Sequence, residues 1–203
     1  EVFLMNVGLS FTPNQRYRIR EGVKSYRRTK SPTCELFYRK ALSPIGDADF
    51  DYLQFSVLQK VKVSYNFNVA YTAFAGKFLR TKNMYFADFK HFTGNLSPIY
   101  TGNTLTTFRY MDYYRYSTQE GFVSLHSDFS FHRLLFKRLP WLNMTNIDEH
   151  FFVNFLRTSD MPYHHIELGY SLSQIFAFLR IDVCTRWKGN AYDGMEVRAG
   201  IGF

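Results

Sequence analysis

Apolar and polar residues alternate along most of this chain. Residues 121–131 place Val123 and Leu125 on one set of alternate positions, and Ser124 and His126 on the other. The same alternation recurs in residues 65–75, 163–170, 176–187 and 195–203. A period of two residues sends successive side chains to opposite faces of a strand. The pattern therefore predicts an all-β protein whose sheet has one apolar and one polar face.

The alternation and the turn signals divide the chain into about ten predicted strands. These segments are 2–11, 33–42, 50–63, 65–78, 84–92, 121–132, 147–157, 163–171, 176–187 and 195–203. If the C-terminus lies in the periplasm, alternating strand direction places residues 12–32, 93–120, 158–162 and 188–194 outside the cell. The long connections 12–32 and 93–120 then lie outside, as is usual in outer-membrane barrels.

Two architectures fit a sheet with one apolar and one polar face. In a soluble sandwich the apolar face meets a second sheet, whereas in a membrane barrel it meets lipid and the polar face lines the lumen. The predicted strands are long enough to cross a bilayer when tilted, and their polar sets mix Gly, Ser, Asn and His with both signs of charge. Aromatic residues also stand at several segment ends, as interfacial girdles require. We therefore predict an antiparallel transmembrane outer-membrane β-barrel.

Composition supports one folded domain over residues 1–203. Aromatic residues make up 19% of the 203 residues, which excludes a disordered chain. No apolar run reaches the roughly 18 residues of a membrane-spanning helix. The chain opens on strand-like residues 2–5 without a signal peptide, so we expect a mature product or a fragment, the C-terminal part of a larger barrel.

Six stretches of the chain carry a family resemblance. They are residues 49–54, 76–79, 85–95, 112–118, 134–142 and 197–203. Together they resemble one outer-membrane family of Bacteroidota, in which a carboxypeptidase-regulatory-like domain precedes a region ending in a barrel. The resemblance implies a barrel similar to those of the outer-membrane assembly-factor superfamily.

That superfamily folds one loop into its lumen, five strands before the C-terminus, through an Arg-Gly motif. The corresponding stretch here is Asp88, Phe89, Lys90, His91, Phe92, Thr93, Gly94 and Asn95. Thr93 stands where the motif has its arginine, so the salt bridge that anchors the superfamily's loop is not expected to form in the same way. Insertase activity is not assigned. The chain ends at Phe203, on the apolar set of its last predicted strand. Bacterial outer-membrane barrels end in such an aromatic strand, which their assembly machinery recognises, so Phe203 is a candidate assembly signal.

The net charge of +8 is concentrated in one connection. Its basic residues are Arg16, Arg18, Arg20, Lys24, Arg27, Arg28 and Lys30, against the single acid Glu21. Guanidinium groups bind phosphate in a bidentate manner, so this loop is a candidate site for lipopolysaccharide or another anion. Nucleic acid needs the same charges, and an ordinary solvated loop explains them equally well.

Charged residues also fall on the inward sets of the last strands. They are His126, Asp128, His150, His165, Glu167, Arg180, Asp182, Arg186, Glu196 and Arg198. We interpret them as a lumen charge network. Histidines near carboxylates suit a metal as well, but we predict no metal and no cofactor.

No catalytic motif is present: Gly-x-Ser-x-Gly, Walker and dinucleotide patterns are absent, and we do not predict an enzyme. The expected function is a bacterial outer-membrane barrel subunit of a cell-envelope assembly, transport or secretion complex. Its expected partners are membrane lipid, lipopolysaccharide and other complex subunits, with no nucleic acid. A small porin-like channel is the first alternative, and a soluble β-sandwich that binds polyanions is the second.

Overall fold

The structure is a computed structural model of the chain. It describes residues 2–26, 29–42, 46–95, 99–100, 103–132, 134–135, 147–176 and 178–201. The elements in these residues are β1 (Leu4–Phe11), β2 (Tyr17–Arg20), β3 (Val23–Tyr26), β4 (Thr33–Ala41), β5 (Asp49–Ser64), β6 (Phe67–Asn83), the 3-10 turn η1 (Phe86–Asp88), β7 (Ile99–Tyr100), β8 (Gly121–Phe131), β9 (Asp148–Thr158), β10 (His165–Ile175), β11 (Leu179–Lys188) and β12 (Ala191–Ile201).

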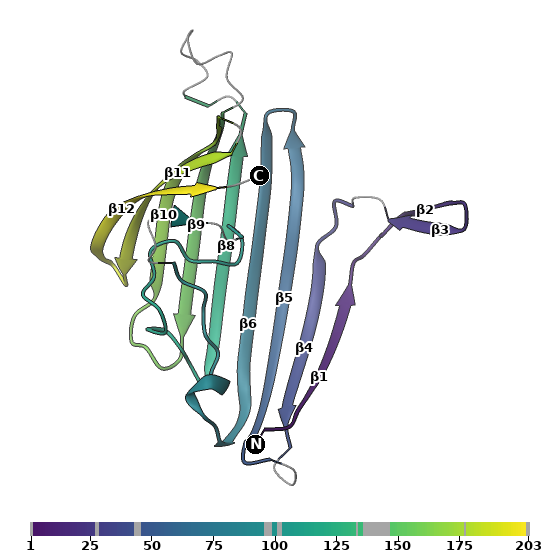
Figure 1. Cartoon of the computed structure of the whole chain (residues 1–203), viewed down its shortest axis with the longest axis vertical. Coiled ribbons are helices and arrows are strands. Elements are labelled where there is room, and N and C mark those ends of the chain that lie inside the picture. Colours follow the sequence, from purple (N-terminus) through teal and green to yellow (C-terminus); the bar gives the residue numbers. More distant parts are fainter. Residues whose placement is uncertain are drawn as a thin grey trace.

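One large sheet dominates the fold. Its strands lie in the order β1-β4-β5-β6-β8-β9-β10-β11-β12-β7, and all neighbours are antiparallel except β12 and β7. In Figure 1 the long connection from β6 to β8 crosses in front of the sheet, and the separate β2–β3 hairpin projects from the side of β1 and β4. The predicted all-β, antiparallel fold is confirmed. The sheet is open among the described residues, because β1 pairs with β4 on one edge only.

Nine of the ten predicted strands match strands of the sheet to within a few residues, but residues 84–92 do not form a strand. The turn η1 interrupts them, with the Asp88 carboxylate accepting the N–H of Tyr85 at 3.2 Å. Such a local bond from side chain to backbone competes with strand pairing. Strand β6 therefore pairs directly with β8.

Because residues 84–92 do not form a strand, the sheet has one strand fewer than predicted. This changes which connections lie at the same end of the sheet. Eight successive antiparallel pairings link β1 to β12, so these two strands run in the same direction. Residues 12–32, which follow β1, therefore lie at the same end as the C-terminal end of β12. The prediction that residues 12–32 and the C-terminus lie at opposite ends of the sheet was wrong, because it counted 84–92 as a strand.

The two faces of the sheet reverse the burial usual in a soluble protein. On one face, here called the apolar face, large side chains are left exposed, with Val123 at 51% and Val197 at 60%. Across the sheet this face carries Val7, Leu9, Phe11, Leu36, Phe55, Leu125, Phe151, Val183 and Met195. On the other face, here called the covered face, Glu167 and His165 are completely buried.

The connection between β6 and β8 is what buries the covered face. Phe108, Met111 and Tyr116 from this connection pack with Leu156 of β9 in one buried apolar cluster. A second cluster joins Phe50, Tyr52, Phe78 and Phe122 with Ala41 and Ala48 nearby on the same side. Among the described residues, no helix is long and apolar enough to cross a membrane.

Candidate functional site

Residues 89–118 are here called the inserted loop, and its described residues 89–95 and 103–118 lie against the covered face of β8–β12. The two ends of the loop are joined by reciprocal backbone hydrogen bonds between Lys90 and Thr118, at 2.9 and 3.1 Å. Further in, the N–H of Phe108 donates to the carbonyl of Thr93 at 2.8 Å. A β-carbon on Gly94 would lie 2.4 Å from the carbonyl oxygen of Met111, so only glycine allows this close approach. The loop is therefore internally braced.

Arg109 is the point at which the loop enters the polar side of the sheet. Its side chain is buried, and its NH1 group donates to Asp182 at 2.7 Å and to Ser171 at 2.9 Å. The guanidinium carbon lies 3.5 Å from the centre of the Phe152 ring, a cation–π contact in a site removed from water. The guanidinium thus binds β9, β10 and β11 at once.

The carboxylates that receive Arg109 are also bound from the sheet itself. Arg180 Nε lies 2.8 Å from Asp182, and Arg180 NH2 lies 3.5 Å from Asp128. His150 Nδ1 is 2.7 Å from the other Asp128 oxygen, while Arg109 NH2 is 3.8 Å from this carboxylate. Two arginines therefore compensate two aspartates, as burial of such charges requires.

Glu167 holds the backbone of the loop. Its two oxygens accept the N–H groups of Arg109 and Tyr110, each at 2.8 Å. The amide of Asn154 donates at 2.8 Å, and His165 Nε2 lies at 3.0 Å. A fully buried carboxylate needs several donors, and half of those seen here come from the loop.

A second group of charges secures the loop beyond Tyr110. Arg186 lies 3.3 Å from Asp112 and its guanidinium carbon is 4.1 Å from the Tyr110 ring centre. Burial raises the pKa of Asp112, but the hydrogen bond from Arg115 and the positive charges of Arg186 and Arg115 outweigh it and hold this pKa below its usual value. Burial raises the pKa of Tyr116 to about 12, so its hydroxyl stays neutral.

Gly169 leaves space for the Phe152 ring, which the Arg109 guanidinium contacts. It stands directly opposite Phe152 in the register, and a β-carbon here would lie 2.0 Å from the Phe152 ring and 2.5 Å from the Val183 carbonyl. An aromatic ring placed over a glycine of the neighbouring strand is a recognised stabilising pair. The order Gly169, Phe152, Arg109 thus forms a stack from sheet to loop.

Comparison with family models decides where this chain belongs. Residues 1–172 match the C-terminal domain of a family of unknown function, DUF5686. The chain belongs to the DUF5686 family. No curated protein and no solved structure matches it.

The residues predicted as a lumen charge network all lie on strands β8–β12. His126, at 3.2 Å from Asn154, joins the Glu167 group. Arg198 pairs with Glu196 at 2.8 Å and also donates to the carbonyl of Asn95 in the loop. The structure thus brings the ten predicted residues to the covered face, and the inserted loop binds several of them, among them Glu167, Asp182 and Arg198.

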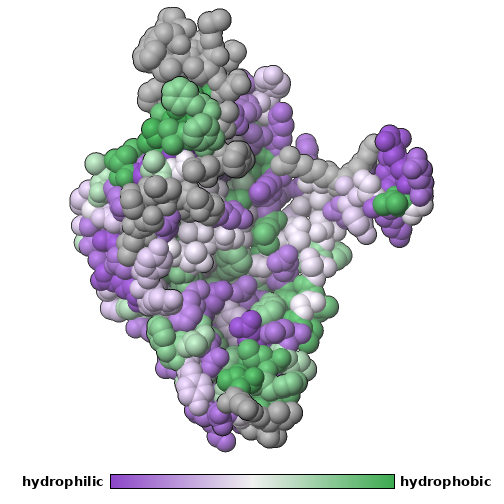
Figure 2. Space-filling view, viewed as in Figure 1, coloured by the Kyte–Doolittle hydropathy of each residue, from purple (hydrophilic) through white to green (hydrophobic). Residues whose placement is uncertain are grey.

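Other predicted residues lie elsewhere. The motif from Asp88 to Asn95 forms the first arm of the inserted loop, with Asn95 its point of contact with Arg198. The basic residues Arg16, Arg18, Arg20, Lys24 and Lys30 lie on or beside the β2–β3 hairpin, which Figure 2 colours mainly as hydrophilic. Arg27, Arg28 and Phe203 lie outside the described residues. Anion binding by the hairpin stays a prediction.

Arg109 is the functional residue that sequence reasoning missed. The prediction looked for an arginine at Thr93 and placed residues 93–120 in a long external connection. A signal was present: Phe108-Arg109-Tyr110 sets a lone cation between aromatic residues in a loop, followed by strands that carry Asp128, Glu167 and Asp182 on their polar sets.

The charged groups of this site bind one another and so hold the inserted loop against the sheet. Its carboxylates and guanidinium groups compensate one another at 2.7–3.8 Å. Within the described part of the chain, no three His, Cys, Asp or Glu side chains are grouped so as to hold a metal ion. The arrangement fixes a loop to a sheet face.

Replacing Glu167 by glutamine tests this anchor from the sheet side. The glutamine amide keeps one acceptor oxygen, but its NH2 group then faces the N–H of Arg109 or of Tyr110, so that two donors meet. We therefore expect the free energy of unfolding to fall by about 3 kcal/mol. Denaturant unfolding in detergent measures it. Glu120→Gln, an exposed carboxyl at the loop's end, is the matched control and changes it by less than about 0.5 kcal/mol. Equal stability of the two variants would contradict the role of Glu167.

Proposed function

We propose that this chain is the C-terminal section of an outer-membrane β-barrel of the Bacteroidota type that its sequence resembles. In that proposal the apolar face contacts lipid and the covered face lines the lumen. The inserted loop fills part of the lumen. The whole barrel serves as a subunit of a cell-envelope assembly, transport or secretion complex.

One observation carries the proposal: the sheet exposes its apolar side chains and buries its charged ones. The row Val61, Val69, Phe129, Phe151, Tyr170, Val183 and Val197 runs across seven neighbouring strands. In water such a face costs roughly 25 cal/mol for each Å² left uncovered. A bilayer removes that cost, and it is the ordinary environment of an alternating strand with apolar residues outward.

The unpaired edge of β1 supports a larger barrel. Backbone groups inside a bilayer must all be hydrogen-bonded, so a sheet that crosses it closes on itself. β1 offers eight residues, Leu4–Phe11, with one neighbour on one side only. We propose that further strands of the same protein pair with this edge and complete the barrel.

The anchored loop supports the likeness to assembly-factor barrels. Five strands, β8–β12, follow the inserted loop, as in the superfamily. Arg109, on the returning arm of the loop, supplies the guanidinium that Thr93 lacks. An anchored loop inside the barrel favours a role in assembly or transport over that of an open channel.

Extraction from native membranes tests the proposal. The protein should stay in the membrane through high salt and alkaline carbonate, and leave it only in detergent. Release by salt alone would instead support the soluble, polyanion-binding sandwich. Such a sandwich also needs a second layer over the apolar face, whereas the described residues leave that face exposed.

Conductance in planar bilayers separates the barrel with an anchored loop from a porin-like channel. We expect the native protein to show little steady conductance, because the inserted loop covers the polar face of β8–β12. Large, stable, single-channel steps would contradict this and favour the channel.

A further inference from the structure

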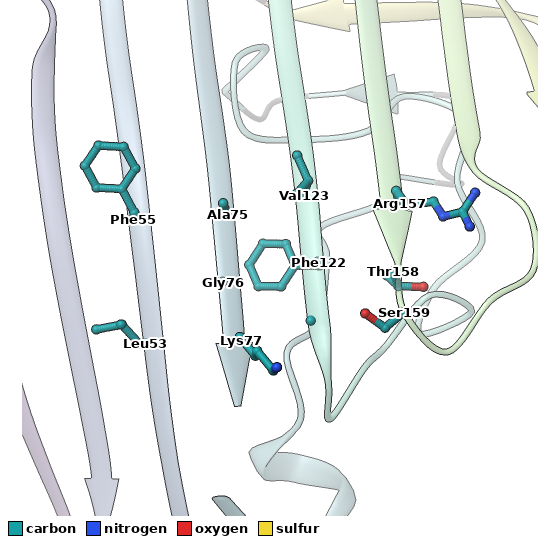
Figure 3. Close-up of a pocket in the computed structure, with 11 residues that line it drawn as sticks. Leu53, Phe55, Ala75, Gly76, Lys77, Phe122, Val123, Arg157, Thr158 and Ser159 are labelled. Carbon is teal, nitrogen blue, oxygen red and sulfur yellow. The ribbon is translucent and has the colours of Figure 1, made fainter. Parts of the chain in front are cut away.

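The apolar face contains a hollow near one end of the sheet. Two adjacent rows of the register form it: Phe55, Ala75, Val123 and Arg157 lie in one row, and Leu53, Lys77, Gly121 and Ser159 lie in or beside the other. Figure 3 shows these side chains coming from β5, β6, β8 and the end of β9. The hollow measures about 720 Å³, large enough for a substantial part of a small amphiphile.

Small residues account for the hollow. Ala75, Gly76 and Gly121 form its floor, between the larger side chains of Phe55 and Val123. Gly76 contributes only its backbone to this floor, because a β-carbon there would point to the covered face, 2.6 Å from the buried Phe122 ring. The neighbouring apolar walls are open to the surroundings, with Phe55 at 45% exposure.

Two cations stand at this hollow without an acidic partner. Lys77 and Arg157 are exposed, and within the described part of the chain neither forms an ion pair. Nearby basic residues behave differently, since Lys40 is 3.3 Å from Asp51 and Arg80 is 2.8 Å from Asp49.

The register sets how far apart the two cations stand. Lys77 is opposite Gly121, and Arg157 is opposite Val123, with only β8 between their strands. Their backbones are therefore about 10 Å apart across the sheet and about 7 Å along it. Long flexible side chains on such a spacing reach one headgroup together.

We propose that this hollow binds an anionic lipid of the membrane through a phosphate of its headgroup. One acyl chain lies on Ala75, Gly76 and Gly121, and the headgroup phosphate binds Lys77 and Arg157. The proposal rests on the proposed membrane location and adds to it a specific lipid site. Charge complementarity carries it: Lys77 lies opposite Gly121, where β8 begins, and Arg157 lies next to Thr158, where β9 ends. A lipid phosphate meets a barrel at the level where its strands end.

Lipid titration of the native protein in detergent, followed by native mass spectrometry, tests the site. The probes are phosphatidylglycerol, whose headgroup carries one net negative charge, and zwitterionic phosphatidylcholine. Wild type should prefer phosphatidylglycerol. Each cation near a membrane surface contributes about fivefold in affinity, so Lys77→Gln with Arg157→Gln should reduce that preference about thirtyfold.

Two further variants make the result specific. Lys60→Gln with Lys62→Gln removes the same charge from the opposite end of the sheet and should leave the preference unchanged. Lys77→Arg with Arg157→Lys keeps both charges and should also keep it. Unchanged preference in the Lys77/Arg157 glutamine variant, or an equal loss in the Lys60/Lys62 control, would overturn the site while the proposed membrane location stands. Release of the native protein from membranes by salt would overturn both.

Discussion

Replacing Arg109 by methionine will detach the inserted loop from the sheet and lower the free energy of unfolding by about 3–5 kcal/mol. Methionine retains much of the packing volume but leaves Asp182 and Asp128 without one of their two arginines. It also removes the contact with the Phe152 ring. Denaturant unfolding in detergent measures the loss, and limited proteolysis of residues 89–118 should become much faster.

Arg115 provides the control for this prediction. It lies on the same loop and pairs with Asp112 at 2.7 Å, but its side chain is 38% exposed. Exposed ion pairs contribute at most about 1 kcal/mol, so Arg115→Met should leave both the stability and the protease resistance nearly intact. If Arg109→Met behaved like Arg115→Met in both measurements, this would contradict the conclusion that Arg109 holds the inserted loop against the sheet.

Introducing a charge on the apolar face gives the second large effect. Val183→Arg should cost about 2–4 kcal/mol and strongly reduce assembly into membranes, because Val183 lies mid-strand and faces lipid in this account. In water the same substitution at a site that is 36% exposed would change stability by less than about 0.5 kcal/mol. The folded fraction in membranes, measured by heat-modified gel mobility, reports the difference.

Val63 is the matched position for this test. It lies on β5 beside the turn to β6 and is 59% exposed. The cost of arginine falls towards zero near the membrane surface, so Val63→Arg should assemble almost normally. Equal tolerance of arginine at Val183 and Val63 would contradict a lipid-facing sheet.

The positions of the strands, and the face of the sheet on which each side chain lies, could be predicted from the sequence. They could be predicted because apolar and polar residues alternate with a period of two residues in most of the strands. In β8, for example, Val123 and Leu125 face one way and His126 and Asp128 the other, as the alternation indicates. The apolar side chains are exposed and many of the charged ones are buried, the reverse of a soluble protein, but the alternation of two residues is unchanged. Register across β8–β12 follows from the same constraint.

The inserted loop could not be predicted in this way. Its position depends on Arg109, whose partners Asp128 and Asp182 lie on strands 19 and 73 residues later in the sequence. No local period encodes such contacts. The error at residues 84–92 is of the same kind, because Tyr85, Ala87 and Phe89 fit a strand pattern while the Asp88 carboxylate caps a turn. One misassigned strand then reversed the end assigned to residues 12–32.

The proposed barrel requires that the apolar face contacts lipid and that the covered face does not. Nitroxide labels at Phe151, Val183 and Val197, which lie in one row of the sheet, test it in reconstituted vesicles. Each is introduced singly in a protein with Cys34 and Cys184 replaced by serine. Collision with oxygen, which concentrates in the bilayer, should be high at all three sites, and collision with a water-soluble nickel chelate should be low. The reverse at these sites, with frequent collisions with the chelate, would contradict the account.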